Sequence, residues 1–165
     1  MTTNLGTLHL FGANNKLVGS QICSKEDAEL FEEGLANKYC ADRFENAPND
    51  YLLKEAKKQF RAYFQGKLIA FDIPIPAFED TFTGHVLKFV HTIPYGVTVS
   101  YKDVAFGLNS GAVRAVGTAI SKCLLSIVIP CHRVITSDGK LGGYGRGKEG
   151  LATKLALLNL EGVNL

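Results

Sequence analysis

The stretch "SIVIPCHRVI" (residues 126–135) places a cysteine and a histidine side by side, directly behind an apolar run and a proline. The apolar run predicts a buried strand. Pro130 ends that strand because proline has no backbone N–H to donate. Cys131 is therefore expected where ordered structure stops, which is the position that a reactive thiol needs.

The pair Cys131 and His132 suits nucleophilic chemistry. Cysteine attacks as the thiolate, so it needs a base, and the base needs a third group that holds its tautomer. Adjacent side chains point in different directions, so a water bridging thiol and imidazole is one expected route for the proton. The competing interpretation is a buried structural thiol beside an ordinary histidine, which on these two residues alone is the commoner situation.

The composition is that of a globular protein, since 165 residues of which 46% are hydrophobic can bury a substantial core. No apolar run approaches the roughly 20 residues of a membrane span, and the start "MTTNLGTLHL" lacks signal-peptide features, so we expect a cytoplasmic protein without membrane contact. Nothing predicts an oligomer interface, so a monomer is expected. The cysteines show no CxxC spacing, which predicts reduced thiols, no bound metal and no cofactor: Cys23, Cys40, Cys123 and Cys131.

The two halves of the chain differ in charge. Residues 1–80 hold nine Lys/Arg against twelve Asp/Glu, whereas residues 81–165 hold nine against four. A basic half joined to an acidic half predicts a polyanionic partner for the C-terminal part. Chance clustering of solvated surface charge explains the same numbers equally well.

The N-terminal half predicts a small sheet with a helix. "TLHLFG" and "LVGSQIC" alternate around a turn at Asn14 and Asn15, which indicates a β-hairpin, and acidic, turn-rich sequence follows. Helical spacing from Asn49 to Gln65 predicts a helix capped by Asn49 and stopped by Gly66. "KLIAFDIPI" (residues 67–75) predicts a strand, and "PIPAFED" (residues 74–80) predicts a linker, so we expect domains at residues 1–77 and 78–165.

The C-terminal half predicts a largely helical domain, which makes the whole chain an α+β protein. A helix is expected from Thr83 to His91, and another from Glu149 to Leu160 with Leu151, Leu155 and Leu158 on its buried stripe. Between them, residues 100–106 and 111–121 predict two short helices joined by "GLNSG", an arrangement that resembles a helix-turn-helix. The second helix surrounds Arg114 with small residues, which permits close approach to another surface or tight packing on a neighbouring helix.

Five ordered blocks carry a family resemblance over most of residues 80–165: "IPYGVTVSY", "RAVGTAI", "SIVIPCHRVI", "GGYG" and "LLNLEG". Together they resemble the O6-alkylguanine-DNA alkyltransferases, the proteins of direct-reversal DNA repair. The N-terminal half is similar to that family only in architecture. The resemblance implies a partner, double-stranded DNA that contains O6-alkylguanine, and leaves O4-alkylthymine open as a second substrate.

The resemblance implies an irreversible transfer of the alkyl group to Cys131. His132 would take the thiol proton through a water, Glu161 would orient and stabilise the imidazole, and Tyr101 would donate to the departing guanine. The product is a thioether with no leaving group, so each molecule is expected to react once.

The resemblance also implies how the base is reached. A base inside a duplex must be rotated into a pocket before it can react. The second short helix would enter the minor groove, with Arg114 taking the place of the extruded nucleotide. Its small residues would give close approach and two lysines would contact phosphates: Val113, Ala115, Gly117, Lys102 and Lys122. Arg133 is expected either as a DNA contact or as an internal ion-pair partner.

The substrate pocket implied by the resemblance lies around the loop "LGGYGRG" (residues 141–147). Composition alone would favour a flexible surface loop here. By resemblance, Tyr144 forms a wall, the Gly145 amide faces O6, Val134 and Cys131 offer backbone carbonyls to the base, and Ile120 completes the pocket.

The chain departs from the family pattern where members commonly carry Asn-Pro, because Cys123 and Leu124 stand there. That Asn tethers the segment between the recognition helix and the active-site strand, and cysteine is a poor hydrogen bonder. Gly145 stands where some members have Ser. Two other functions remain as alternatives: a lesion-sensing DNA binder without transfer, although such proteins replace the active-site Cys, and a cysteine hydrolase that uses Cys131, His132 and Glu161 on a small acyl substrate.

Overall fold

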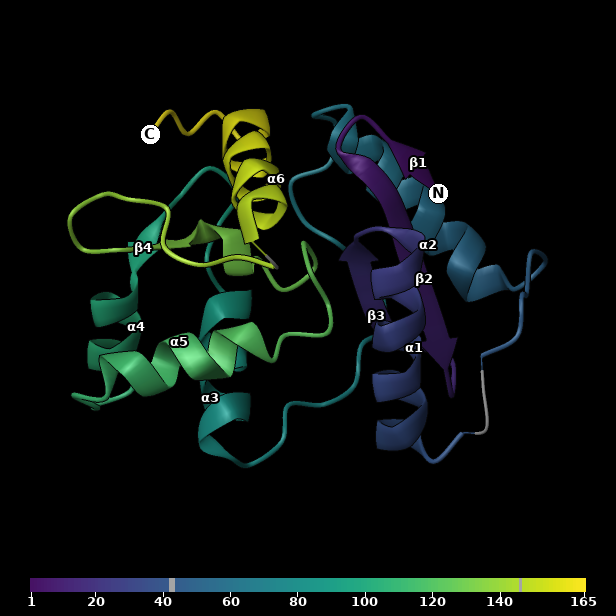
Figure 1. Cartoon of the computed structure of the whole chain (residues 1–165), viewed down its shortest axis with the longest axis horizontal. Helices are drawn as coiled ribbons and strands as arrows, with labels where there is room; N and C mark the ends of the chain where they lie inside the picture. Colours follow the sequence, from purple (N-terminus) through teal and green to yellow (C-terminus); the bar gives the residue numbers. More distant parts are fainter. Residues whose placement is uncertain (42–43, 146) are drawn as a thin grey trace. The chain divides into compact units, whose positions relative to one another are not determined.

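The computed structural model describes residues 1–41, 44–145 and 147–165, and the chain divides into two compact units (Figure 1). The first unit holds Met1–Pro76 together with Leu124–Ser126, and the second holds Ala77–Cys123 together with Ile127–Leu165. The first contains a sheet and helices, while the second is mainly helical, in agreement with the expected α+β class.

The sheet of the first unit has the order β1-β2-β3 and is antiparallel, with strands β1 (Thr2–Thr3), β2 (Gly6–Ala13) and β3 (Lys16–Ile22). The predicted hairpin is confirmed. Its turn residues Asn14 and Asn15 have φ of 51° and 56°, a left-handed conformation that asparagine tolerates and that a two-residue hairpin turn requires.

Helices α1 (Lys25–Tyr39) and α2 (Tyr51–Phe64) pack on this hairpin, α1 in front of it and α2 behind it in Figure 1. The predicted helix at residues 49–65 is confirmed as α2, with its cap one residue later than expected. The Asp50 side chain accepts from the Leu53 N–H at 2.8 Å, and Phe60 and Tyr63 are fully buried.

Two expectations for this unit were wrong. The acidic sequence after the hairpin is not turn-rich but forms α1, with Ser24 as its N-cap. The apolar residues of α1 are too sparse to predict a helix from their spacing. "KLIAFDIPI" forms no strand. The Gln59 side chain bonds both backbone groups of Asp72, at 2.8 and 2.9 Å, and Pro74 and Pro76 have no N–H to donate to a ladder.

The second unit contains α3 (Phe82–His91), α4 (Tyr101–Gly107) and α5 (Val113–Ser121), which pack against one another. The core between them includes fully buried valines: Val86, Val90, Val104 and Val116. Helices α4 and α5 follow each other across a turn at Asn109 (φ 52°), as the helix-turn-helix pattern predicts.

The strands of the second unit connect α4 to the cysteine segment. A 3₁₀ turn, η1 (Cys131–Arg133), leads into β5 (Val134–Ile135), which pairs in parallel with β4 (Val99–Ser100). Tyr101 begins α4 directly after β4. The pairing therefore joins the segment that carries Tyr101 to the one that carries Cys131.

The apolar run before Cys131 is buried as expected, but it is not a strand. Leu124–Ser126 runs beside β3: Ser20 N–H donates to the Leu124 carbonyl at 2.9 Å and Ser126 N–H donates to the Ser20 carbonyl at 3.0 Å. The chain then turns at Ile127, whose φ of 77° is rare for a β-branched residue. This pairing holds the segment that begins at Leu124, where the chain departs from the Asn-Pro of the family pattern.

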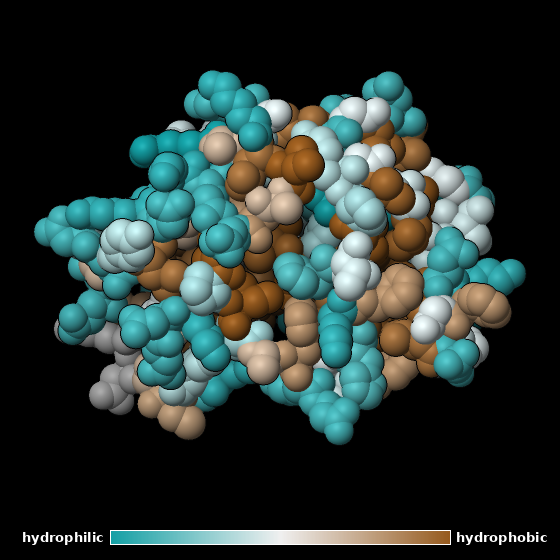
Figure 2. Space-filling view, turned by 180° about the vertical axis from the view of Figure 1, so that it is seen from behind, coloured by the Kyte–Doolittle hydropathy of each residue, from teal (hydrophilic) through white to brown (hydrophobic). Residues whose placement is uncertain are grey.

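Helix α6 (Gly147–Leu160) closes the chain and begins two residues earlier than predicted. The predicted leucine stripe is wrong at Leu151, which is 36% exposed, because the buried face is instead formed by Lys154, Leu157 and Leu158. No helix in the described ranges is long and apolar enough to cross a membrane. In Figure 2 hydrophilic side chains project from the viewed face and hydrophobic ones lie mostly in recesses between them.

Candidate active site

Cys131 occupies the first position of η1 and is 4% exposed. The turn is closed by the Arg133 N–H, which donates to the Pro130 carbonyl at 2.9 Å, and by the Val134 N–H, which donates to the Cys131 carbonyl. Pro130 thus ends the apolar segment as predicted and starts the turn that holds the thiol.

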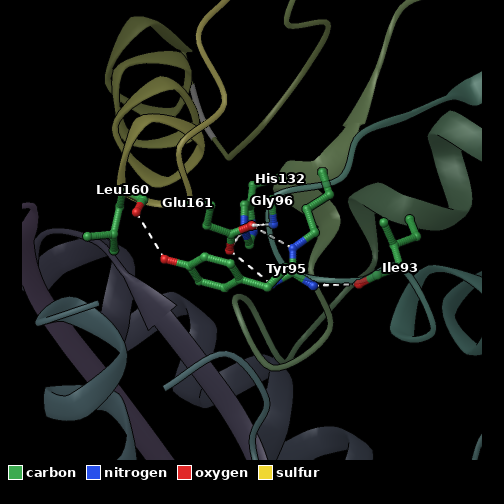
Figure 3. Close-up of polar contacts among 7 residues, drawn as sticks. Ile93, Tyr95, Gly96, His132, Leu160 and Glu161 are labelled. Carbon is green, nitrogen blue, oxygen red and sulfur yellow. Dashed lines mark hydrogen bonds and ion pairs between the residues drawn. The ribbon is translucent and has the colours of Figure 1, made fainter. Parts of the chain in front are cut away.

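The imidazole of His132 faces the carboxylate of Glu161 in a buried contact (Figure 3). Its Nε2 lies 2.8 Å from Glu161 Oε1, and both side chains are fully buried. A carboxylate is only an acceptor, so we assign the proton to Nε2. In this tautomer the lone pair of the neutral ring is on Nδ1, which is the atom able to take a proton from a thiol.

Glu161 accepts four N–H groups. Arg133 Nε donates to Oε2 at 2.8 Å and Arg133 Nη2 donates to Oε1 at 2.9 Å, and the Gly96 N–H donates to Oε2 at 3.1 Å in addition to the His132 contact. Arg133 is therefore an internal ion-pair partner, one of its two expected roles. Its guanidinium also donates to the Ile93 carbonyl and lies 5.8 Å from the centroid of the Tyr95 ring (Figure 3).

The end of α6 fixes the position of Glu161. Gly162, with φ of 80°, terminates the helix: its N–H donates to the Asn159 carbonyl at 3.0 Å, and the Val163 N–H donates to the Leu158 carbonyl at 2.9 Å. These two bonds are the Schellman motif, which places Glu161 at the C-cap. Gly96 must also be glycine, because its φ is 72° and a Cβ there would lie 3.0 Å from the Glu161 carbonyl oxygen.

Lys154 is a buried cation that sequence reasoning missed. Its Nζ donates to the carbonyls of Val134 at 2.6 Å, Leu141, and Gly143 at 3.4 Å, and it lies 5.8 Å from the centroid of the Tyr101 ring. Burial lowers the pKa of Lys154 to about 8, while the nearby Cys131 opposes that shift. No local signal in the sequence marks it, because a lysine within a helix is usually solvated.

Tyr101 packs against the glycine-rich loop. Its hydroxyl donates to the Gly143 carbonyl at 3.3 Å. Gly142 permits this contact, because it has φ of 69° and a Cβ there would lie 2.9 Å from the ring. Burial raises the pKa of Tyr101, negative charge on Cys131 would raise it further, and the bond to Gly143 opposes both. The phenol therefore keeps its proton.

The expected pocket residues gather around this loop. Val134 and Ile120 are buried, Tyr144 is half-buried and Gly145 is exposed with φ of 50°. The carbonyls of Val134 and Cys131, expected to face the base, already accept from Lys154 and from the Val134 N–H. Each carbonyl oxygen has a second lone pair, so a further donor is still accommodated. Arg146, within the same loop, lies outside the described residues.

Helix α5 has one buried and one exposed face. Val116, Ala119 and Ile120 are buried, whereas Val113, Arg114 and Ala115 are exposed. Gly117 is half-buried, and a Cβ there would lie 4.0 Å from the Tyr101 ring. The small residues thus serve both alternatives, packing on one side and an accessible surface on the other. Lys102 and Lys122 are exposed as well.

The environment keeps the resting thiol and imidazole neutral. A hydrogen bond with the Cys123 side chain, together with burial, raises the pKa of Cys131 well above its usual value, against the opposing charge of Lys154. Burial lowers the pKa of His132, although Glu161 acts in the other direction. Proton transfer from Cys131 to His132 would create an imidazolium facing Glu161 and a thiolate near Lys154.

This fold and site define a class: a protein with a buried cysteine next to a histidine–carboxylate pair, in a unit that also holds a helix-turn-helix. Residues 1–77 match the model of the 6-O-methylguanine DNA methyltransferase, ribonuclease-like domain, and residues 81–163 match that of the 6-O-methylguanine DNA methyltransferase, DNA binding domain. The chain belongs to the 6-O-methylguanine DNA methyltransferase family, also called the methylated-DNA–protein-cysteine methyltransferases.

The chain is similar to known proteins over most of its length. A methylated-DNA–protein-cysteine methyltransferase of Methanosarcina barkeri is 45% identical over 118 residues, which cover 71% of this chain and 73% of the relative. One of Sulfolobus acidocaldarius is 34% identical over 156 residues, 94% of this chain and 95% of the relative. The Mycobacterium tuberculosis protein crystallised with DNA has a TM-score of 0.76 and 32% identity, covering 98% of this chain and 89% of that one.

Proposed function

We propose that this chain repairs O6-methylguanine in DNA by moving the methyl group to its own Cys131, once per molecule. The observation that carries the proposal is the buried Cys131 beside the His132–Glu161 pair in a chain of this family. In the reaction a bond forms between Cys131 Sγ and the methyl carbon while the bond from that carbon to O6 breaks. The electron pair stays with the guanine, which gains a proton, and the thiol proton leaves through His132.

His132 is the proposed base and Glu161 its positioning residue. The contact at 2.8 Å holds Nε2–H toward the carboxylate and leaves Nδ1 to accept the thiol proton, directly or through a water. The carboxylate then faces the imidazolium that forms and stabilises it. The ion pair with Arg133 and the Gly96 N–H support this role, because they hold Glu161 from two further sides.

Tyr101 is the proposed donor to the departing guanine, and Lys154 is proposed to stabilise the Cys131 thiolate. Both lie against the loop at Gly143, where Tyr101 keeps its proton and Lys154 keeps a positive charge near the thiol. A donor to the leaving group lowers the barrier as negative charge develops on the base. To act, the Tyr101 hydroxyl has to exchange its bond to Gly143 for one to the guanine.

Double-stranded DNA that contains O6-alkylguanine is the proposed partner, bound through α5. Arg114 is exposed there and is proposed to fill the place of the extruded nucleotide. The neighbouring small residues Val113, Ala115 and Gly117 permit entry into the narrow minor groove. Lys102 and Lys122 are proposed phosphate contacts. The related M. tuberculosis protein crystallised with DNA supports this partner.

The proposed pocket for the extruded base is bounded by the loop at residues 141–145 and by η1. Tyr144 is its proposed wall, the Gly145 amide its proposed donor to O6, and Val134 and Ile120 its apolar lining. The open backbone at Gly143, where a Cβ would meet no atom within 4 Å, supports close approach of a flat base. O4-alkylthymine stays open as a second substrate.

The domain boundary near residue 77 is also proposed. The division of contacts between Pro76 and Ala77 supports it, and so does the end of the first family match at residue 77. The segment Leu124–Ser126 belongs with the first unit although it comes from the second half of the chain, so the two halves are not expected to be fully independent.

The test is the intact mass of the protein after mixing with an equimolar duplex that carries one O6-methylguanine. We expect a gain of one CH2, stopping at one equivalent, with the added group on Cys131 in fragment spectra. Cys131→Ser should show no gain, while Cys40→Ser, which alters an exposed thiol in the first unit, should gain as the wild type does.

Two outcomes would contradict the proposal and favour its alternatives. Tight binding of the lesion duplex without any gain in mass would make the chain a damage sensor. Continuous turnover of a small acyl ester without DNA binding would make it a cysteine hydrolase.

A further inference from the structure

Tyr95 lies against the end of α6, next to the residue that carries the carboxylate of the site (Figure 3). Its hydroxyl donates to the Leu160 carbonyl at 3.0 Å, although the two residues are 65 positions apart in the sequence. The bond completes the end of the helix, because the Schellman motif uses the carbonyls of Leu158 and Asn159 and the Tyr95 hydroxyl takes the next one. The backbone directly before Glu161 is therefore tied to Tyr95.

The ring of Tyr95 lies near the counter-ion of the same carboxylate. The guanidinium carbon of Arg133 is 5.8 Å from the ring centroid, a distance at which a cation is attracted to an aromatic ring. Arg133 in turn donates two N–H groups to Glu161, at 2.8 and 2.9 Å. One side chain thus contacts both sides of the buried ion pair, the cation through its ring and the helix end of the carboxylate through its hydroxyl.

The chain on either side of Tyr95 contacts the same ion pair. The Ile93 carbonyl accepts from Arg133, and the Gly96 N–H donates to Glu161 at 3.1 Å. Tyr95 lies between these two backbone contacts, so its side chain anchors the segment that supplies them. Burial raises the pKa of Tyr95, and the charge of Glu161 raises it further against the opposing charge of Arg133. The hydroxyl therefore stays a donor at neutral pH.

We propose that Tyr95 is a positioning residue of the methyl transfer and acts through Glu161. This inference rests on the proposed function, in which His132 is the base and depends on a carboxylate held 2.8 Å from its Nε2. A hydrogen bond weakens steeply as its distance and angle depart from the optimum. Without the Tyr95 hydroxyl the end of α6 loses a tie, and the carboxylate is held less firmly against the imidazole.

The first test is the rate of single-turnover transfer from a saturating O6-methylguanine duplex. Tyr95→Phe keeps the ring and removes the hydroxyl, so we expect the rate to fall about three- to tenfold, the effect of one neutral hydrogen bond, with the affinity for the duplex unchanged. Tyr95→Leu, which removes the ring as well, should be slower still. Tyr51→Phe is the matched control, because Tyr51 is 83% exposed in the other unit, and it should react as the wild type does.

The second test measures the His132 ring without DNA, by nitrogen NMR of isotope-labelled protein at a temperature where each variant is folded. In the wild type the proton should be on Nε2, facing Glu161. In Tyr95→Phe part of the population should carry it on Nδ1, and the pKa of His132 should fall because the Glu161 contact, which raises it, is weakened. A purely structural role would lower the free energy of unfolding and leave both signals unchanged.

The third test repeats Tyr95→Phe in the Glu161→Gln background. A residue that acts through Glu161 should have no further effect on the rate there. Equal slowing in both backgrounds would overturn the proposal, and so would an unchanged rate or unchanged His132 signals in Tyr95→Phe. The NMR measurement does not depend on repair. Altered His132 signals in a chain whose wild type transfers no methyl group would therefore refute the repair function and leave the tie from Tyr95 to the His132–Glu161 pair standing.

Discussion

Replacing Glu161 by glutamine tests the buried polar cluster that organises the site. The carboxylate is 5% exposed and accepts N–H groups from His132, Arg133 and Gly96 on its two oxygens. Glutamine keeps the shape but offers one acceptor oxygen and an NH2 group. Whichever way the amide is turned, two of the four N–H donors face another donor, and the Arg133 guanidinium is left buried without a counter-charge.

The expected loss of stability is large. Removing one partner of a buried ion pair destabilises a protein by about 3–5 kcal/mol, because the remaining charge is uncompensated. At about 2–4 °C per kcal/mol for a chain of this size, the midpoint of thermal unfolding should fall by roughly 6–20 °C. The same change removes the carboxylate that sets the His132 tautomer, so methyl transfer should slow by roughly 10²–10⁴-fold.

Urea unfolding of the wild type and Glu161→Gln measures the first effect, and single-turnover transfer from an O6-methylguanine duplex, at a temperature where the variant is folded, measures the second. Glu149→Gln is the matched control, since Glu149 is an exposed residue of α6 and its change should alter stability by less than about 0.5 kcal/mol. Replacing Arg133 by methionine in the Glu161→Gln background should recover part of the loss, because the orphaned charge disappears. A loss below about 1 kcal/mol in the single variant would refute the assignment of a compensating buried pair.

Three further predictions test the other parts of the site. Lys154→Met should slow methyl transfer at least about tenfold. It should also lower the free energy of unfolding by about 1–3 kcal/mol, because the Val134 and Leu141 carbonyls lose their donor. Single-turnover rates and urea unfolding measure the two effects, and an unchanged rate would exclude Lys154 from the mechanism. Arg114→Ala should reduce transfer from duplex DNA about tenfold or more without changing transfer from the free modified base, so an equal loss on both would contradict a role in extrusion. The free energy of unfolding should fall as the pH drops below 6.5, by up to about 1.4 kcal/mol per pH unit, because His132 is protonated in the unfolded chain while burial lowers its pKa in the folded one. Urea unfolding from pH 7 to 5 measures this slope, which should be smaller in His132→Gln. An equal slope in that variant would contradict the prediction.

Local signals made much of the fold predictable. The Asn14–Asn15 turn, the α2 pattern and the glycines at residues 66 and 162 act within a few residues, so they could be recognised without the rest of the chain. One wrongly predicted segment depends on a distant partner. The apolar run before Cys131 became a turn because residues 124–126 pair with Ser20, more than a hundred positions away.

The site was predictable to a different extent. Cys131, His132 and Glu161 could be predicted because each lies in one of the ordered sequence blocks of the family resemblance. The structure brings His132 and Glu161 into contact. Lys154 was missed because a lysine within a helix is usually solvated, and nothing local indicates that one carbonyl of β5 and two of the glycine-rich loop will accept from it. Cys123 was noticed only as a departure from a family pattern.

In the proposed mechanism, the arrangement of charges would keep the buried thiol unreactive until substrate is in place. With the pKa of Cys131 raised and that of His132 lowered, both groups are neutral at rest. Moving the proton between them creates two charges in a poorly solvated site, where each faces an opposite charge already held in position: Glu161 for the imidazolium and Lys154 for the thiolate. In the proposed reaction the thiolate would therefore be favoured only within this set of contacts, and transfer of a methyl group to Cys131 would remove its charge. A site with a permanently ionised thiol would react with any electrophile that reached it, and because S-methylation is irreversible, each such encounter would consume a molecule.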